Sequence, residues 1–372
     1  MAYSPSFLAI QKELNDKYGT VFRQIGQVDR RRLPTGVFNL DYCLGGGLPV
    51  NRVILICGHK ACYKTILALK TIKSYQSLCN FCFESISNCS CGGQFSLDRD
   101  EEIIISGPLK TVYIDTEHAL DPALPLRLGI NPENFYIFDP PHGEAACQYA
   151  EKFARIPEVG IIVTDSLAAL VPEDELEKGY FDKMAQSLRS RLIARMYRAL
   201  ITHLNKSGYP PRLAIAINHL LPNRGGYGDI LPGGETQKYL SSVVLKLQII
   251  RKQYICIDKK GEEVLEEEED SDEPKRAVKL VDPDASKIRK QPIRFIVEHS
   301  KVSPDLMKGE FEIFLGEDRD IRFGDTDDFN AVYYRASKIG LTDGVKKSDL
   351  RQLWREDKLA YERIKRSIIQ GI

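Results

Sequence analysis

The chain has 372 residues, of which 43% are hydrophobic and 28% are charged, as is usual for a globular protein. Lys plus Arg and Asp plus Glu number 52 each, so the net charge gives no indication of a nucleic-acid or membrane partner. No run reaches the roughly 18 apolar residues of a membrane span, and residues 1–5 do not resemble a secretion signal. We therefore expect a cytoplasmic protein without a membrane partner, whose nine cysteines serve as thiols or metal ligands.

A short amphipathic helix is expected near the N-terminus, over residues 6–17. Such a helix is too short to be stable alone, so it packs either on its own domain or, as an arm, on a neighbouring subunit. Its apolar positions are Phe7, Leu8, Ile10 and Leu14.

The next feature is a stretch with the spacing of a phosphate-binding loop, placed between an apolar strand at 53–57 and a helix. In such a loop, backbone N–H groups and the helix N-terminus bind phosphates. Lys64 is expected to reach the β- and γ-phosphates, and the Thr65 hydroxyl to ligate Mg²⁺. Tyr63 replaces the second glycine of the motif, so a buried strand–turn–helix without nucleotide stays open as an alternative. The expected nucleotide-binding residues are Gly58, His59, Lys60, Ala61, Cys62, Tyr63, Lys64 and Thr65.

Four cysteines follow within thirteen residues, as two closely spaced pairs with glycines after the last. This pattern is typical of a Cys₄ zinc knuckle, and four thiolates leave no open position for catalysis, so the Zn²⁺ would be structural. A set of unrelated buried thiols is the alternative. Residues 94–108 are then expected to form a polar loop. The four predicted ligands are Cys79, Cys82, Cys89 and Cys91.

Apolar runs typical of buried strands recur at 111–115, 160–165 and 213–217, and each ends in polar side chains. A helix with a continuous apolar stripe is expected over 184–205. Strands that alternate with helices predict a doubly wound parallel α/β sheet, with its site at the carboxyl edge. The run 160–165 ends in Asp165, as does a Walker B strand, whose Asp holds the Mg²⁺ shell.

The Gly- and Pro-rich segment 221–236 comes directly after the polar end of a predicted strand. We expect a flexible loop there, placed to sense what occupies the site. A further strand is predicted over 239–251.

Two charged segments complete the chain. Residues 258–273 carry ten acidic residues against two Lys, which indicates a disordered, solvated run, with an autoinhibitory nucleic-acid mimic as the alternative. The tail, 330–372, is expected to be helical. Its ten Lys and Arg between Arg335 and Arg366 either contact nucleic-acid phosphates or form an ordinary solvated face.

Several motifs resemble those of RecA-type homologous-recombination ATPases, over about residues 8–316. The resemblance implies a RecA-like P-loop ATPase core, in which helices flank a parallel twisted sheet. Tyr63 and the Asn218-His219 pair are similar to the phage recombinases of the UvsX type. The matching motifs are DTEHALDP at 115–122, DSLAALVP at 165–172, KYG at 17–19, LPTG at 33–36, LD at 40–41 and LP at 48–49.

The resemblance implies roles for three carboxylates. Glu117 would be the general base that activates the attacking water, unless it is a surface acid without a partner. Asp165 would hold the Mg²⁺ shell, unless it only caps its strand. Asp121 matches the residue that reads the adenine amino group, whereas the adenine-stacking Tyr of the family has no match because Leu124 stands there.

The resemblance also implies residues that sense nucleotide or contact DNA. His219 would be the γ-phosphate sensor, unless it is a satisfied strand-end histidine, and 221–236 would be the second DNA-binding loop, with 172–186 as the first. Lys301 would reach the nucleotide of the neighbouring subunit, unless it is a solvated surface lysine, and His299 stands where the family has a second such lysine. The expected DNA-binding residues are Arg191, Arg224, Gly225 and Gly226.

The function so implied is that of a DNA-dependent ATPase recombinase. It would form ATP-bound filaments on single-stranded DNA and pair that DNA with a homologous duplex, in bacterial or phage recombination and repair. Its cofactors would be ATP, Mg²⁺ and structural Zn²⁺, and further expected partners are single-strand-binding and loader proteins. A weakly or non-hydrolysing ATP-gated DNA-binding scaffold is the alternative, and a hexameric helicase or motor is a third hypothesis.

The expected organisation has three parts. Residues 1–33 form the N-terminal helix and oligomerisation arm, and 34–316 form the ATPase core. A Cys-rich insertion at 76–108 and an acidic disordered insertion at 256–291 interrupt the core. Residues 317–372 form a small helical C-terminal region.

Overall fold

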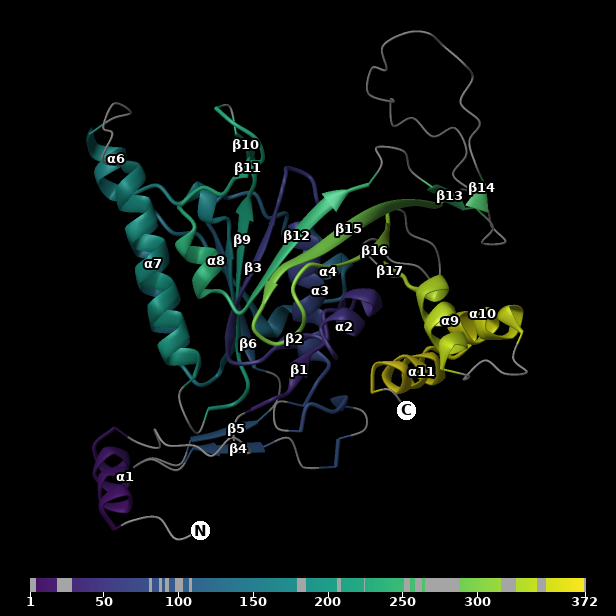
Figure 1. Ribbon diagram of the computed structural model, residues 1–372, viewed down its shortest axis with the longest axis horizontal. Helices are drawn as coiled ribbons and strands as arrows, with labels where there is room; N and C mark the ends of the chain where they lie inside the picture. The colour runs from purple at the N-terminus through teal and green to yellow at the C-terminus, as the bar shows by residue number, and fades with distance from the viewer. Residues whose placement is uncertain are drawn as a thin grey trace.

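The fold is that of a computed structural model of the chain, shown in Figure 1. Nothing is said below of the structure of the remaining residues. The residues that the structure describes are 5–18, 29–79, 82–86, 89–90, 94–97, 103–106, 109–178, 185–205, 209–223, 225–250, 255–257, 263–264, 288–315, 326–339 and 346–370.

An 11-stranded sheet forms the centre of the molecule, in the order β14-β13-β15-β12-β3-β9-β8-β6-β7, with β16 paired to β15 and β17 to β16. The strands from β12 to β7 are parallel to one another, and β15 joins β12 antiparallel. The strands are β3 (Arg52–Gly58), β6 (Lys110–Asp115), β7 (Phe135–Phe138), β8 (Val159–Asp165), β9 (Leu213–His219), β12 (Val243–Ile249), β13 (Ile255–Ile257), β14 (Glu263–Val264), β15 (Ile288–Ser300), β16 (Met307–Phe314) and β17 (Thr326–Asp327).

Helices cover both faces of the parallel strands, which is why these strands are continuous apolar runs. Along β3, Ile54 and Ile56 face a cluster that includes α3 (Lys64–Gln76), because successive side chains point to opposite faces. Val53 and Leu55 face a second cluster, with α5 (Gly143–Ala154) and α7 (Ala185–Leu204). The predicted doubly wound α/β core is confirmed, and β7 is a strand that the sequence prediction did not include.

The predicted helical tail is confirmed. The helices α9 (Phe329–Lys338), α10 (Lys347–Glu356) and α11 (Lys358–Gln370) share a third apolar cluster with Phe38 of α2 (Phe38–Cys43). Figure 1 shows these helices at one flank of the sheet, beyond β16 and β17. The predicted acidic run lies outside the described residues, apart from β14.

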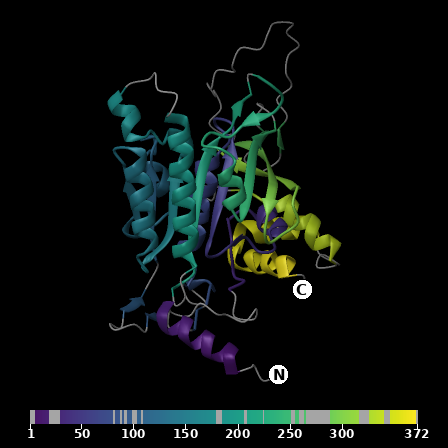
Figure 2. The ribbon, with the colours of Figure 1, turned by 60° about the vertical axis from the view of Figure 1, so that its left-hand side comes forward.

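The N-terminal helix and a small hairpin lie beyond one end of the sheet. α1 (Pro5–Tyr18) has the predicted extent, and Figures 1 and 2 both show it apart from the sheet. β4 (Gln94–Leu97) pairs antiparallel with β5 (Ile103–Ser106), so the prediction of a polar loop over 94–108 is wrong. β5 contains the apolar run Ile103–Ile105, which a partner strand can hold in register.

A second small hairpin lies at the carboxyl edge of the sheet. β10 (Leu221–Pro222) follows β9 directly and pairs with β11 (Asp229–Ile230). α8 (Thr236–Leu240) then leads into β12. In Figure 1 this hairpin projects from the end of the sheet opposite to α1.

Candidate nucleotide-binding site

Four neighbouring strands bring their polar ends together at the carboxyl edge of the sheet. Gly58 at the end of β3 is level with His219 of β9, and Asp115 of β6 is level with Asp165 of β8. Since β8 also pairs with β9, the four strand ends form one continuous edge. This register places the predicted phosphate loop beside the predicted magnesium and sensor residues.

The loop between β3 and α3 has a left-handed residue where the motif has its second glycine, although that residue is Tyr63. Tyr63 has φ 60° and ψ 29°, in the left-handed region, directly before α3 begins at Lys64. Its half-buried ring packs against the apolar cluster that contains α3. Glycine at position 58 allows the end of β3 to lie close to the backbone of β12, because a Cβ there would lie 2.5 Å from the carbonyl oxygen of Leu247. Packing thus holds a tyrosine in a conformation that normally favours glycine.

Lys64 lies buried at the start of α3. Its Nζ donates to the carbonyl oxygens of Gly58 (3.1 Å) and His59 (2.8 Å), and it lies 3.3 Å from Nδ1 of His219. Burial lowers the pKa of the Lys64 ammonium, and nearby anionic groups oppose that shift. These partners are weak acceptors compared with a polyphosphate, so the geometry suits an ammonium that takes up an anion.

Thr65 and Asp165 form the predicted pair of Mg²⁺ ligands. Oδ2 of Asp165 accepts hydrogen bonds from the Thr65 hydroxyl (2.7 Å) and from the Tyr113 hydroxyl (2.5 Å). Burial raises the pKa of Asp165, against the effect of these two donors. A carboxylate and a hydroxyl in contact match the oxygen ligands that Mg²⁺ prefers, so these residues fit the ion. Tyr113 was not among the predicted site residues.

Glu117 lies directly beyond β6, and Oε1 accepts from the Ser166 hydroxyl at 2.5 Å and lies 2.8 Å from Nε2 of His219. The hydrogen bond with His219, followed by that of Ser166, lowers the pKa of Glu117 to about 2. The carboxylate is therefore ionised at neutral pH. Asp115 accepts the backbone N–H groups of Glu117 (3.2 Å) and Leu120 (2.9 Å) and so holds the turn that carries Glu117.

His219 lies between Lys64 and Glu117, and its Nδ1 and Nε2 atoms face these two side chains. The preceding residue, Asn218, is fully buried, and its Nδ2 donates to Gln237 Oε1 (2.8 Å) and to the carbonyl oxygen of Pro232 (2.9 Å). The end of β9 is therefore hydrogen-bonded to the far end of the predicted DNA-binding loop. Asn218 and Gln237 were missed as linking residues, because 19 positions separate them in the chain.

Two of the predicted residues, Lys301 and His299, lie away from this edge. Lys301 Nζ donates to the carbonyl oxygen of Tyr239 (3.1 Å), and its backbone N–H bonds to Ser242, at the amino end of β12. The phosphate loop meets β12 at Leu247, about 16 Å from Ser242 along the strand. Lys301 and its near neighbour His299 are therefore not placed to reach the nucleotide site of their own chain.

The predicted DNA-contact and adenine residues are exposed. Arg191 lies on α7 and Asp121 in the loop after β6, where its Oδ1 accepts the N–H of Ala123 at 2.9 Å. Gly225 and Gly226 lie exposed between β10 and β11. Arg224 lies outside the described residues.

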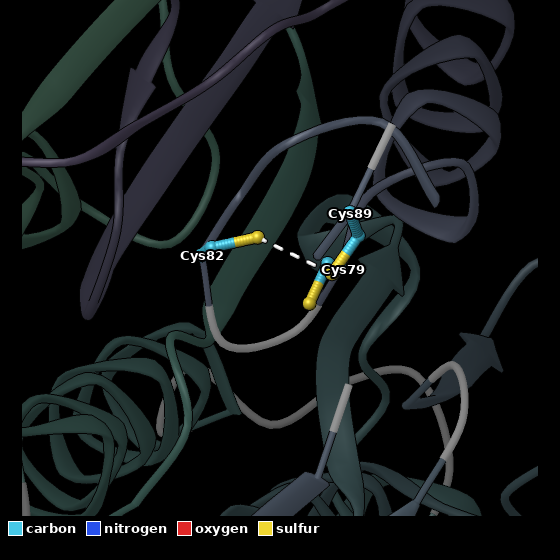
Figure 3. A group of neighbouring side chains, drawn as sticks. All are labelled: Cys79, Cys82 and Cys89. Atoms are coloured by element: carbon cyan, nitrogen blue, oxygen red, sulfur yellow. Dashed lines mark hydrogen bonds between the residues drawn. The ribbon is translucent and has the colours of Figure 1, made fainter. Parts of the chain in front are cut away.

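Three of the four predicted zinc ligands lie together, as Figure 3 shows. The Sγ atoms of Cys79, Cys82 and Cys89 all lie within 4.8 Å of one another, and those of Cys82 and Cys89 are 3.6 Å apart. The N–H of Phe83 donates to the carbonyl oxygen of Cys79 at 3.0 Å, so the first pair stands on a tight turn. Cys91 lies outside the described residues. Thiolate ligands in such a cluster suit Zn²⁺.

No helix in the described part of the chain has both the length and the apolar character that crossing a membrane requires.

The fold and this edge define an α/β protein of the phosphate-loop class, and comparison with known proteins identifies the family. Residues 102–270 match the family described as the RecA N-terminal domain. Protein RecA of Aquifex aeolicus is 30% identical over 299 residues, which are 79% of this chain and 69% of that protein. The chain belongs to the RecA family.

Two further comparisons are less extensive. Protein RecA of Crocosphaera subtropica is 32% identical over 247 residues, and the match spans 65% of this chain and 61% of that protein. A solved structure described as the RadB recombinase covers 76% of this chain and 96% of its own, with a TM-score of 0.45 and 19% identity. That structural likeness is too low to support an argument about the site.

Proposed function

We propose that this chain is a DNA-dependent ATPase recombinase, which forms ATP-bound filaments on single-stranded DNA and pairs that DNA with a homologous duplex. The observation that carries the proposal is the joining of Lys64, His219 and Glu117 through the two nitrogens of one imidazole. The side chains proposed as phosphate-binding cation, γ-phosphate sensor and general base are thus in contact at one edge of the sheet. Membership of the RecA family supports the same conclusion.

In this proposal the phosphate loop binds ATP, with Lys64 on the β- and γ-phosphates and the helix N-terminus of α3 behind them. Thr65 and Asp165 would hold Mg²⁺, which neutralises phosphate charge when bound. Asp121 would contact the adenine. Tyr113 would orient Asp165, because its hydroxyl donates a hydrogen bond to Oδ2 of Asp165, as the Thr65 hydroxyl does.

Glu117 would accept a proton from the water that attacks the γ-phosphorus, as the bond to the leaving oxygen breaks. While His219 donates to Glu117, the pKa of that carboxylate is about 2, so it is a weak base. We infer that His219 turns to the γ-phosphate when ATP binds. The loss of its hydrogen bond then raises the pKa of Glu117 and makes the carboxylate a better proton acceptor.

The position of Lys301 supports a nucleotide shared between protomers. Lys301 and His299 lie at the end of β12 remote from their own phosphate loop, so they would act on the nucleotide of a neighbour. A cation supplied by the adjacent subunit neutralises charge in the transition state. The filament would therefore be the ATPase-competent form.

DNA would bind along the loops at the carboxyl edge, through Arg191 and through Arg224, Gly225 and Gly226. Exposed glycines let the backbone approach phosphates closely, and the arginines supply positive charge. Single-strand-binding and loader proteins remain expected partners of such a filament.

A structural Zn²⁺ at the cysteine cluster is a second proposal. Cys79, Cys82 and Cys89 would supply three thiolates, and Cys91 the fourth. Binding of these thiolates to one Zn²⁺ would connect side chains that are otherwise separate and would make this segment rigid.

The Glu117→Gln variant tests the ATPase proposal. Without a proton acceptor, DNA-stimulated turnover should fall by a factor of about 10² to 10⁴, while ATP binding is retained. The measurement is ATP hydrolysis with and without single-stranded DNA, beside equilibrium binding of the nucleotide. Glu133→Gln, the same change at an exposed residue away from the site, is the matched control.

Stimulation by DNA that the Glu117→Gln variant loses would support the recombinase, and strand exchange would be the next assay. Tight DNA binding with no turnover that depends on Glu117 would overturn the ATPase proposal. The chain would then be an ATP-gated DNA-binding scaffold.

A further inference from the structure

One acidic residue of the hairpin β10–β11 is bound to the phosphate loop and to the sheet at once. Oδ1 of Asp229 lies 3.2 Å from Nε2 of His59, the second residue of the phosphate loop. Oδ2 of Asp229 accepts from Nζ of Lys246 at 2.7 Å. Lys246 belongs to β12, directly opposite Cys57 at the end of β3. None of these contacts has a part in the hydrolysis proposed above.

The position of Asp229 gives these contacts a mechanical consequence. Asp229 pairs with Pro222 across the hairpin, and Pro222 lies three residues after His219. Bonds from Asp229 to His59 and Lys246 therefore hold the whole hairpin down on the phosphate loop. The side chains of Asp229 and Lys246 are 22% and 16% exposed, so solvent screens their attraction only in part.

We propose that Asp229 is a latch that ATP opens: without nucleotide its carboxylate holds Lys246 and His59, and the triphosphate displaces it and frees the hairpin for single-stranded DNA. Asp229 is thus a positioning residue for the hairpin, and Lys246 a further contact of the bound phosphates. This inference rests on the proposed function, because it takes the hairpin as part of the DNA-binding surface.

Charge explains why the two anions compete. The hydrogen bond and charge of Lys246 lower the pKa of Asp229, so Asp229 is ionised at neutral pH. ATP brings about four negative charges to the same loop, and a carboxylate beside them is repelled. The ammonium of Lys246 can then exchange one oxygen anion for another without being left unpaired. By thermodynamic linkage, a change that weakens the latch should have two effects. It should favour DNA binding in the absence of nucleotide, and it should favour nucleotide binding in the absence of DNA.

The test uses the full chain and an oligo-dT probe, with affinities measured by fluorescence anisotropy in the presence and absence of a non-hydrolysable ATP analogue. In Asp229→Asn the DNA affinity without nucleotide should rise at least tenfold, whereas the affinity with the analogue changes little. The nucleotide-gating ratio, defined as the quotient of these two affinities, should therefore fall by about the same factor.

The control must separate a latch from the removal of one negative charge near DNA. Glu235→Gln removes the same charge from the same loop. Glu235 pairs with Lys238 at 3.3 Å and, within the described part of the chain, has no hydrogen bond or ion pair with Asp229, Lys246 or His59. If loss of charge acts only generally, Glu235→Gln should raise the DNA affinity by the same factor with and without the ATP analogue. The gating ratio of this variant should then stay within twofold of the wild type.

Nucleotide affinity without DNA provides an independent readout. Asp229→Asn should bind the ATP analogue several-fold more tightly, because the competing anion is gone. Lys246→Met should bind it more weakly, because a phosphate contact is lost, although its gating ratio also falls. A simple structural role for both residues would weaken nucleotide binding in both variants.

An unchanged gating ratio in Asp229→Asn overturns the latch, and so does equal loss of DNA binding with and without nucleotide. If the wild type itself shows no nucleotide-dependent DNA binding, the proposed function fails, and the opposite signs expected for the two variants in nucleotide affinity still decide the latch.

Discussion

Tyr63 is the residue at which the sequence departs from the phosphate-loop motif while the backbone does not. The motif has glycine at this position because the backbone there is left-handed. In this protein the backbone keeps that conformation, with Tyr63 at φ 60°. A left-handed non-glycine residue costs roughly 1–2 kcal/mol. The half-buried ring, packed against the cluster of α3, offsets that cost.

This account predicts different results for two substitutions of Tyr63. Tyr63→Gly should bind the ATP analogue within about threefold of the wild type, although the fold loses the packing of the ring. Tyr63→Val should bind at least about tenfold more weakly, because a β-branched residue strongly disfavours positive φ and distorts the loop. Isothermal titration calorimetry measures both. Equal losses in the two variants would mean that the tyrosine ring, and not the backbone conformation, supports nucleotide binding.

At the scale of single elements, the cysteine segment connects parts that are distant in sequence. Phe83, next to Cys82, packs edge-to-face on Tyr75 of α3, and the guanidinium of Arg31 lies 5.2 Å from its ring centre. Glu84 forms an ion pair with Arg366 of α11 at 3.3 Å. A metal at this turn would therefore stabilise the contact between α3 and the C-terminal helices.

We predict one Zn²⁺ per chain, held tightly enough to survive dialysis. Its removal by a chelator should lower the thermal unfolding midpoint by several degrees, because a ligand at about 100 times its Kd contributes roughly 2.7 kcal/mol. Cys82→Ser should reduce the zinc content measured by atomic emission, whereas Cys147→Ser, a buried cysteine of α5, should retain it. Full zinc content in Cys82→Ser would contradict the site.

At the scale of the whole molecule, the proposed ATP site is incomplete in one chain. Glu117 and Lys64 lie at the carboxyl edge of the sheet, whereas Lys301 lies at the opposite end of β12. The proposed head-to-tail assembly would bring the two surfaces together, since each protomer would offer one surface to each neighbour.

This arrangement predicts complementation between two inactive variants. Lys301→Ala and Glu117→Gln should each lose DNA-stimulated hydrolysis, and a 1:1 mixture should recover about a quarter of the wild-type rate, because random assembly makes about one interface in four intact. ATP hydrolysis across a series of mixing ratios is the measurement. The control is Lys308→Ala, which changes an exposed lysine of β16, the strand paired with β15. This variant should hydrolyse ATP without a second variant in the mixture. No recovery in the mixture would place the action of Lys301 outside the shared site.

The sequence by itself determined the features that depend on local order. The spacing from Gly58 to Thr65 specifies a strand–loop–helix, and apolar runs that end at Asp115, Asp165 and His219 specify buried parallel strands. Parallel strands place their carboxyl ends at one edge, so the edge that carries the candidate site could be predicted as well. Local patterns also predicted α1 and the helical tail.

Only the tertiary structure decided which side chains meet. The contacts of Tyr113 with Asp165, of Asn218 with Gln237 and of Asp229 with His59 depend on strand register and on the path of loops. A short window of sequence determines neither the strand register nor the loop path. Local preferences allow many backbone conformations, and burial and long-range pairing select one of them. For the same reason Arg212 gave no sign of being buried, although it is 1% exposed and donates to Ala154 at the end of α5.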